Sequence, residues 1–325
     1  PFAPRHKACF GLMRTPARTL KAAMPLANFA KAPRAATFAT PALPALVVFA
    51  HLRWDFVWQR PQHLLSRLAR YWRVVYVEEP QHDPHAPAAG RLQVREVAPK
   101  VTVVAMHTRS VTPGFADDTM PALHALLDAW LRRAGMRHAV AWFYTPMALP
   151  LLSAVAARAV VYDCMDELSA FHLAPPQLRA REHALMQRAD LVLTGGPSLY
   201  AARRSLHANC HCLPSAIDAQ HYDPARLDPR SALAARADAL QGKLTSPRLR
   251  YFGVIDERLA PDIVAAMAQA RPQWQFVMVG PVVKIDAASL PRAPNIHWLG
   301  MQDYALLPYL LAGWNVCLMP FARNA

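Results

Sequence analysis

LVVFAHLRWDFVWQRPQHLLSRLA, residues 46–69, carries the signals of a buried strand, a loop and a helix in succession. Its first five residues form a continuous apolar run, which is typical of a strand that is covered on both faces. Pro61 suits the first turn of a helix, and three leucines between residues 64 and 68 would form its apolar stripe. The stretch predicts a βα unit whose polar and aromatic loop follows the carboxyl end of a strand, where α/β proteins place their binding groups.

The same alternation recurs along most of the chain. Candidate strands lie at residues 46–50, 73–79, 101–106, 139–144, 159–163 and 191–195, and later at 248–255, 274–280, 295–300 and 315–321. Helical patterns separate them, the clearest being an apolar stripe over residues 123–131 that starts near Pro121 and stops at Gly135. Repeated βα units predict parallel sheets with helices on both faces.

The pattern divides the chain into four parts. Residues 1–45 form a basic extension without periodicity, and residues 46–217 contain six candidate strands of a first Rossmann-like domain. Residues 218–247 are rich in Pro, Asp, Arg and Ala and are expected to be a linker. Residues 248–325 contain four candidate strands, whereas a doubly wound domain normally has five or six, so the second Rossmann-like domain is expected to be incomplete.

Charge and composition exclude several classes of protein. The formal net charge is +14, but seven of these charges lie before residue 46, where no acidic residue occurs. No apolar run reaches the 18 residues that a membrane span requires. The five cysteines are odd in number and scattered, which favours a reducing compartment and a cytoplasmic location. Neither G-x-G-x-x-G nor G-x-x-x-x-G-K-[ST] occurs, which removes the usual phosphate-loop classes.

Seven ordered strings together resemble bacterial GT-B-fold glycosyltransferases of the family-four-like group, which builds surface polysaccharides. The strings are RWDFVWQRPQHLLSRLA, VVYDCMDELSAF, ADLVLTGGPSLY, RLRYFGVIDERL, VMVGPVVKID, LPRAPNIHWLG and CLMPFARN. The resemblance runs from about residue 46 to the end. It implies an α/β protein with two Rossmann-like domains that face each other across a cleft. It also implies that a later donor-binding segment is missing, which could leave this chain inactive.

The resemblance implies transfer of a sugar from a nucleotide-diphosphate sugar to a hydroxyl of a glycan or lipid-linked glycan, with no other cofactor. The second domain would bind the donor and the first domain the acceptor. Charge grows on the diphosphate as it leaves, so cations or helix N-termini are needed there. Gly253 ends a strand, Asp256 could cap the next helix, and Arg258 would lie in the first turn of that helix. The other donor-side candidates are Gly280, Lys284, Arg323 and Asn324, although Lys284 could equally be a loop lysine in solvent.

On the acceptor side, His51 follows the first strand directly, and a neutral imidazole there could orient or deprotonate a hydroxyl. Asp163 is the second catalytic candidate, and it belongs to an acidic cluster that could line the acceptor side or cap a helix. The acceptor-binding candidates are Arg53, Trp54, Gln59, Arg60, Asp166, Glu167 and Gly196. An alternative is that Phe56, Val57 and Trp58 fill the core and that Arg60 is a surface residue at a helix start.

No metal site is expected. The acids of residues 163–167 do not form the D-x-D of metal-dependent transferases, and arginines with a helix terminus can neutralise a diphosphate. The spacing of His207, Cys210, His211 and Cys212 matches no zinc motif, and the segment suits a short strand. Glu182 falls on the apolar stripe of a helix, which predicts a buried ion pair.

Two other functions stay open. A pI near 10.1 could indicate a non-catalytic polyanion or nucleic-acid binder, but half of the excess charge is in the extension and no nucleic-acid motif is present, so no nucleic-acid partner is expected. A GT-B nucleotide-sugar epimerase is the other alternative, and the polar string at 51–63 argues against it because an epimerase binds no separate acceptor. Peripheral contact with an anionic membrane at its inner face is a further hypothesis.

Overall fold

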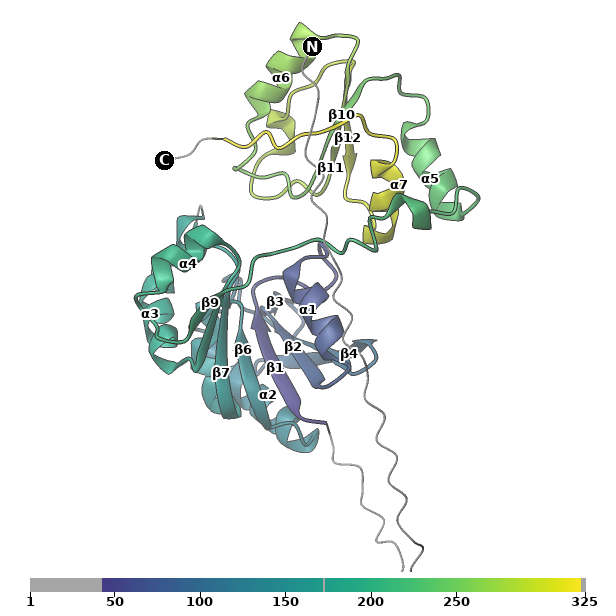
Figure 1. The fold of residues 1–325 in the computed structure, drawn as a ribbon. Helices are drawn as coiled ribbons and strands as arrows, with labels where there is room; N and C mark the ends of the chain where they lie inside the picture. Colours follow the sequence, from purple (N-terminus) through teal and green to yellow (C-terminus); the bar gives the residue numbers. More distant parts are fainter. Residues whose placement is uncertain (1–42, 172, 323–325) are drawn as a thin grey trace, which may run out of the picture. The chain divides into compact units, whose positions relative to one another are not determined.

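The computed structural model describes residues 43–171 and 173–322. Nearly all of the predicted basic extension therefore lies outside the described residues, as do Arg323 and Asn324. The described chain contains one nine-stranded and one four-stranded sheet (Figure 1). The fold is α/β, as predicted, and the second sheet is the smaller.

The first sheet has the order β3-β5-β2-β1-β6-β7-β8-β9, with β4 paired to the outer side of β5. Its strands are β1 (Ala45–Ala50), β2 (Arg73–Glu78), β3 (Gln81–His82), β4 (Arg91–Ala98), β5 (Val101–Thr108), β6 (His138–Phe143), β7 (Ala156–Cys164), β8 (Leu191–Thr194) and β9 (Cys210–Cys212). All pairs are parallel except β4 with β5. Because β2 and β6 lie on opposite sides of β1, the strand order reverses at β1 and β6, and their carboxyl ends form the crevice where ligands bind in open α/β sheets.

Helices cover both faces of this sheet. Helix α1 (Arg60–Leu68) packs Leu65 against the face that carries Val48 and Tyr76. On the opposite face lie α2 (Met120–Arg133), the 3-10 helix η1 (Pro146–Ala154) and α3 (Leu178–Arg188). The short helices η2 (Leu168–Ala170) and α4 (Pro197–Arg203) complete this part of the chain. Burial on both faces explains why the strands are nearly continuous apolar runs.

The second sheet has the order β12-β11-β10-β13, and all its pairs are parallel. Its strands are β10 (Arg248–Phe252), β11 (Gln275–Val279), β12 (Ile296–Gly300) and β13 (Val316–Cys317). Helix α6 (Pro261–Ala270) covers the face of Phe276 and Met278, while α5 (Ala232–Gln241) and α7 (Leu307–Leu311) cover the face of Val277 and Val279 (Figure 1). The 3-10 helices are η3 (Pro224–Arg226), η4 (Ala287–Ser289) and η5 (Tyr304–Leu306).

Ten predicted strands match strands of the two sheets, within a few residues at their ends for most. The sequence reasoning overlooked β3 and β4, because RLQVREVA in β4 alternates polar and apolar residues and most of its side chains are exposed or half-buried. The range 218–247, expected to be a linker, contains the ten-residue helix α5. Its Ala-rich sequence has no clear apolar stripe, yet Ala237 packs in the core with Val277 and Val279. The division into domains stays a prediction.

Among the described residues, no helix is both long enough and apolar enough to cross a membrane.

Candidate functional site

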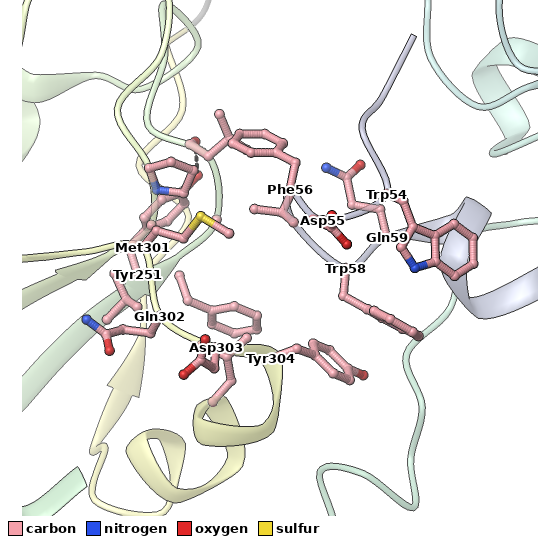
Figure 2. A pocket seen from close by; sticks show the side chains of 18 of the residues that line it. Trp54, Asp55, Phe56, Trp58, Gln59, Tyr251, Met301, Gln302, Asp303 and Tyr304 are labelled. Atoms are coloured by element: carbon pink, nitrogen blue, oxygen red, sulfur yellow. Dashed lines mark hydrogen bonds between the residues drawn. The ribbon is translucent and has the colours of Figure 1, made fainter. Parts of the chain in front are cut away.

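A cavity of about 510 Å³ lies at the carboxyl ends of β10, β11 and β12, and the loop that joins β1 to α1 faces it. Figure 2 shows Trp58 and Gln59 from this loop opposite Met301, Gln302 and Tyr304. The volume is in the range of small-molecule sites. Five predicted site residues line the cavity: Trp54, Gln59, Gly253, Arg258 and Gly280.

Aromatic side chains form one wall of the cavity. The ring of Tyr304 stacks on His221, with centroids 3.9 Å apart and planes inclined by 7°, and it also stacks on Trp58 at 5.7 Å and 23°. The hydroxyl of Tyr304 lies 3.4 Å from Nε2 of His63 on α1. These contacts join the β1–α1 loop to the residues that follow β12, and both Trp58 and Tyr304 line the cavity.

Two glycines let the strands of the second sheet end close together. Gly280 follows β11 with φ +147°, and a Cβ atom there would overlap the carbonyl oxygen of Gly253, which follows β10 with φ +152°. The amide of Gly253 donates to the carbonyl of Val279, and that of Gly280 donates to the carbonyl of Gly300. The floor of the cavity is therefore backbone that no larger residue could replace without displacement.

Arg258 carries a positive charge to the cavity, and Asp256 fixes its direction. Nε and Nη2 of Arg258 donate to the Asp256 carboxylate at 3.0 and 2.7 Å, while Asp256 is almost fully buried and Arg258 is partly exposed. Helix α6 begins only at Pro261 with Ala260 as its N-cap, so the expectations that Asp256 caps it and that Arg258 lies in its first turn were wrong. Proline at the helix start, where a missing amide costs nothing, sets this boundary.

Lys284 lies on the loop after β11, and His51 on the loop after β1 lies near it. Nζ of Lys284 is 4.0 Å from Glu257 and 4.5 Å from the ring centroid of Phe171. Burial lowers the pKa of His51 to about 4, the backbone of Tyr144 opposes this, and the charge of Lys284 adds to the lowering. Nδ1 of His51 is buried and has no hydrogen-bond partner within the described residues. The imidazole is therefore neutral at pH 7.

Asp166 is close enough to Arg258 to feel its charge. It follows β7, burial raises the pKa of its carboxyl, and Arg258 opposes that rise. The structure thus brings together His51, Asp166, Arg258 and Lys284, which sequence reasoning had placed on two sides of a cleft.

Arg60 and Asp163 are paired with each other. Nε of Arg60 lies 3.0 Å from Oδ1 of Asp163 and Nη1 donates to the carbonyl of Leu213 at 2.6 Å, with both charged side chains almost fully buried. Burial raises the pKa of Asp163, and the hydrogen bonds from Arg60 oppose this. Neither residue lines the cavity. This ion pair links α1 to β7. The acceptor-binding role of Arg60 and the catalytic role of Asp163 stay predictions.

Glu167 belongs to a second group of charged side chains, which also contains Glu182 and Arg203. Nη2 of the buried Arg203 lies 2.8 Å from both Glu167 and Glu182, and the hydroxyl of Tyr162 donates to Glu182 at 2.7 Å. Glu182 therefore forms the predicted ion pair, in which Arg203 is buried and Glu182 is half-buried.

The remaining predicted residues lie elsewhere. Nη1 of Arg53 donates to the backbone of Glu79 at 3.3 Å and lies 3.5 Å from Glu78. Gly196 is the N-cap of α4 and has open space around its Cα. Within the described residues, no three His, Cys, Asp or Glu side chains are grouped so that they could hold a metal ion.

Sequence reasoning missed the last residue of β10 and the residues that follow β12, which contribute much of the cavity wall: Phe252, Met301, Gln302, Asp303 and Tyr304. The signal was present, because Met301–Tyr304 directly follow the predicted strand 295–300, and carboxyl ends of parallel strands share one edge. Tyr222 was missed for a different reason: it lies in the expected linker.

Comparison with known proteins agrees with this architecture. No family profile matches the chain. The structure of Anabaena Alr3699/HepE in complex with UDP and glucose is similar with a TM-score of 0.56 and 16% identity, covering 84% of this chain and 73% of that one. An E. coli structure described as trehalose-6-phosphate bound with UDP-2-fluoro glucose is similar with a TM-score of 0.55 and 12% identity. The match covers 84% of this chain and 77% of that one. The structure of a glycosyltransferase from Rickettsia africae is similar with a TM-score of 0.51 and 10% identity, and the match covers 85% of this chain and 72% of that one.

The chain has the GT-B fold. A distant curated homologue from Bacillus subtilis (strain 168), named "Putative teichuronic acid biosynthesis glycosyltransferase TuaH", is 24% identical over 200 residues, which are 56% of this chain and 48% of that protein. The chain thus spans about half the length of the curated relative. In this GT-B chain the cavity lies at the carboxyl edge of the second sheet and faces the carboxyl edge of the first.

Gly280→Ala is expected to destabilise the protein by about 1–3 kcal/mol, because the added methyl group must displace the Gly253 loop and the residue must keep a positive φ. Gly300→Ala is the matched control, since Gly300 also has a positive φ but open space around its Cα. Urea unfolding of the three proteins measures the difference. An equal loss of unfolding free energy in both variants would show that the close approach of the two loops does not contribute to the cost of Gly280→Ala.

His51→Gln is expected to change how stability depends on pH. Because the folded pKa of His51 is about 4 and the ordinary value is 6.5, the unfolded chain binds a proton between these values while the folded chain does not. The free energy of unfolding therefore loses up to about 3 kcal/mol through this residue as pH falls from 7 to 4. The stability difference between wild type and variant should change over this window, measured by urea unfolding at several pH values. A stability difference that stays constant over this window would contradict the buried neutral state of His51.

Proposed function

We propose that the chain is a metal-independent GT-B glycosyltransferase that moves a sugar from a UDP-sugar to an acceptor hydroxyl. The observation that carries the proposal is the cavity at the carboxyl edge of the second sheet, where Arg258 lies beside a floor of glycine backbone. The similar structures from Anabaena and E. coli, described as bound with UDP and glucose and with UDP-2-fluoro glucose, support a UDP-sugar as donor.

The diphosphate would lie beside Arg258 and Lys284. Asp256 occupies Nε and Nη2 of Arg258, so Nη1 is left to donate to a phosphate oxygen. As the bond between the anomeric carbon and the diphosphate breaks, negative charge grows on the leaving oxygen, and fixed cations stabilise it. No metal is required for this task, because the two cations and the backbone at the glycine turns supply the positive potential.

The nucleoside would lie against the aromatic wall. Trp58 and Tyr304 line this wall and stack on each other, and Gln302 and Asp303 follow β12 at the same edge. Base stacking on such rings needs little conformational ordering, because stacked rings already hold each other in place. Recognition of uracil in preference to guanine is a proposal that the binding experiment below tests.

The acceptor would approach from the first sheet. His51 is neutral and its Nδ1 is an unpaired buried acceptor or donor, so it can hold an acceptor hydroxyl or a hydroxyl of the transferred sugar without adding charge. Asp166, beside Arg258, is the second group within this region. A glycan or lipid-linked glycan is the proposed acceptor class, since the TuaH relative is named for teichuronic acid biosynthesis.

We propose that this activity takes place in the cytoplasm and that the protein contacts the inner face of a membrane when the acceptor is lipid-linked. Four cysteines of the described chain, Cys164, Cys210, Cys212 and Cys317, carry free thiols, which supports a reducing compartment.

Calorimetric titration with UDP and GDP tests the donor site. The protein is expected to bind UDP more tightly than GDP, and Arg258→Ala should weaken UDP binding about ten- to a hundredfold, since a hydrogen bond to a charged group is worth roughly 1.5–3 kcal/mol. Arg292→Ala is the control, because Arg292 is an exposed arginine of the same half of the chain that does not line the cavity. Equal affinities for wild type and Arg258→Ala would remove the donor-site assignment.

Release of UDP from UDP-sugars then separates the transferase from its alternatives. A transferase should release UDP faster when a glycan acceptor is added, whereas an epimerase would convert the sugar without such a dependence. A polyanion binder would bind heparin or nucleic acid as tightly as UDP and release nothing.

A further inference from the structure

Phe171 lies where the first sheet meets the two cations of the second sheet. Its ring centroid is 4.5 Å from Nζ of Lys284 and 5.3 Å from Cζ of Arg258. Phe171 directly follows η2, on the loop that leaves β7, whereas the two cations lie on the loops that leave β11 and β10. One aromatic ring from the acceptor side therefore contacts both donor-side cations.

The contact has a clear physical basis. The face of an aromatic ring carries negative potential and attracts a cation within about 6 Å of its centroid. Both cations lie within this distance of the Phe171 ring, so the ring attracts each of them. Each cation also has a carboxylate neighbour, with Asp256 at 2.7 Å from Arg258 and Glu257 at 4.0 Å from Lys284. The ring is thus a third, uncharged partner that the two cations share.

An aromatic partner, unlike a carboxylate, leaves the N–H groups of the cations free to donate hydrogen bonds. A carboxylate at this position would occupy donors of Arg258 and Lys284 and would cancel their charge. The ring of Phe171 orients the cations through its face while accepting no conventional hydrogen bond, so their remaining N–H groups stay available to phosphate oxygens.

The loop that carries Phe171 is held by its own contacts. Glu167 lies 2.8 Å from the buried Arg203, and the hydroxyl of Ser169 donates to Glu167 at 2.8 Å. The amide of Phe171 donates to the carbonyl of Leu168. Glu167, a predicted acceptor residue, therefore anchors the turn that presents the ring.

We propose that Phe171 is a positioning residue for the donor diphosphate: its ring, supplied by the acceptor-side loop, holds Arg258 and Lys284 in place for the two phosphates. This rests on the proposed function for the identity of the ligand, but the contact between the ring and the cations does not. Donor binding is thereby coupled to the relative placement of the loops after β7, β10 and β11.

The first test compares Phe171→Tyr, Phe171→Trp and Phe171→Leu in calorimetric titrations with UDP and with inorganic pyrophosphate. Leucine keeps an apolar side chain of similar size but loses the ring, so it should weaken both ligands about three- to tenfold, the factor for one or two exposed cation–π contacts. Tyrosine and tryptophan should retain wild-type affinity. Tyr71→Leu, at an exposed aromatic residue outside the cavity, should change nothing. Equal affinity of the leucine and wild-type proteins would overturn the proposal.

A second readout needs no ligand. In protein labelled with ¹³C-lysine, the ring current of Phe171 should shift the ε-methylene signal of Lys284 upfield, and Phe171→Leu should remove that shift. Lys284→Arg identifies the signal. An unshifted Lys284 signal in the wild type would overturn the contact itself. If wild type binds pyrophosphate in a Phe171-dependent way but no UDP or other nucleotide, the positioning role stands and the proposed transferase function fails.

Discussion

Parallel strand pairing is the constraint on which the rest of this structure depends. Strands β1, β2 and β6 run in one direction, as do β10, β11 and β12, so each set ends at one edge of its sheet. Every loop that leaves those strands must start at that edge, whatever its sequence. Gly253 and Gly280, which follow two paired strands of the second sheet, are neighbours for this reason.

Electrostatic compensation governs what the cavity can do. Arg258, which lines the cavity, is oriented by Asp256, and Lys284, on the loop after β11, has Glu257 near it. The Asp256 carboxylate offsets the charge of Arg258 and fixes its direction in the absence of a ligand. A diphosphate bound as proposed would then meet an Arg258 that is already ordered, which would reduce the entropy lost on binding. The buried Arg60–Asp163 pair has a different role. The two charges neutralise each other, and the pair holds α1 against β7.

Much of the fold was predictable, because strands buried on both faces leave near-continuous apolar runs, as in LVVFA and VVYVE. The same logic correctly directed attention to residues just after strands, including Gly253, Arg258 and Gly280, which line the cavity. Pairings between distant side chains were not predictable. Arg60 and Asp163 are 103 positions apart, and nothing local shows that they meet. The same holds for Phe171 and its cations, and for Tyr304 and His221. The local error at Asp256 arose because a carboxylate before a helix also has another use, to orient an arginine two residues later.

The central claim, that the carboxyl edge of the second sheet binds the nucleotide of a sugar donor, is tested most directly by backbone hydrogen exchange with and without saturating UDP. The account predicts slower exchange in residues 253–259, 280–285 and 300–304, and in the facing loop 51–59, with little change in the distal strands β4 and β5. Protection confined to the group around Arg203, or none in these loops at saturation, would contradict it.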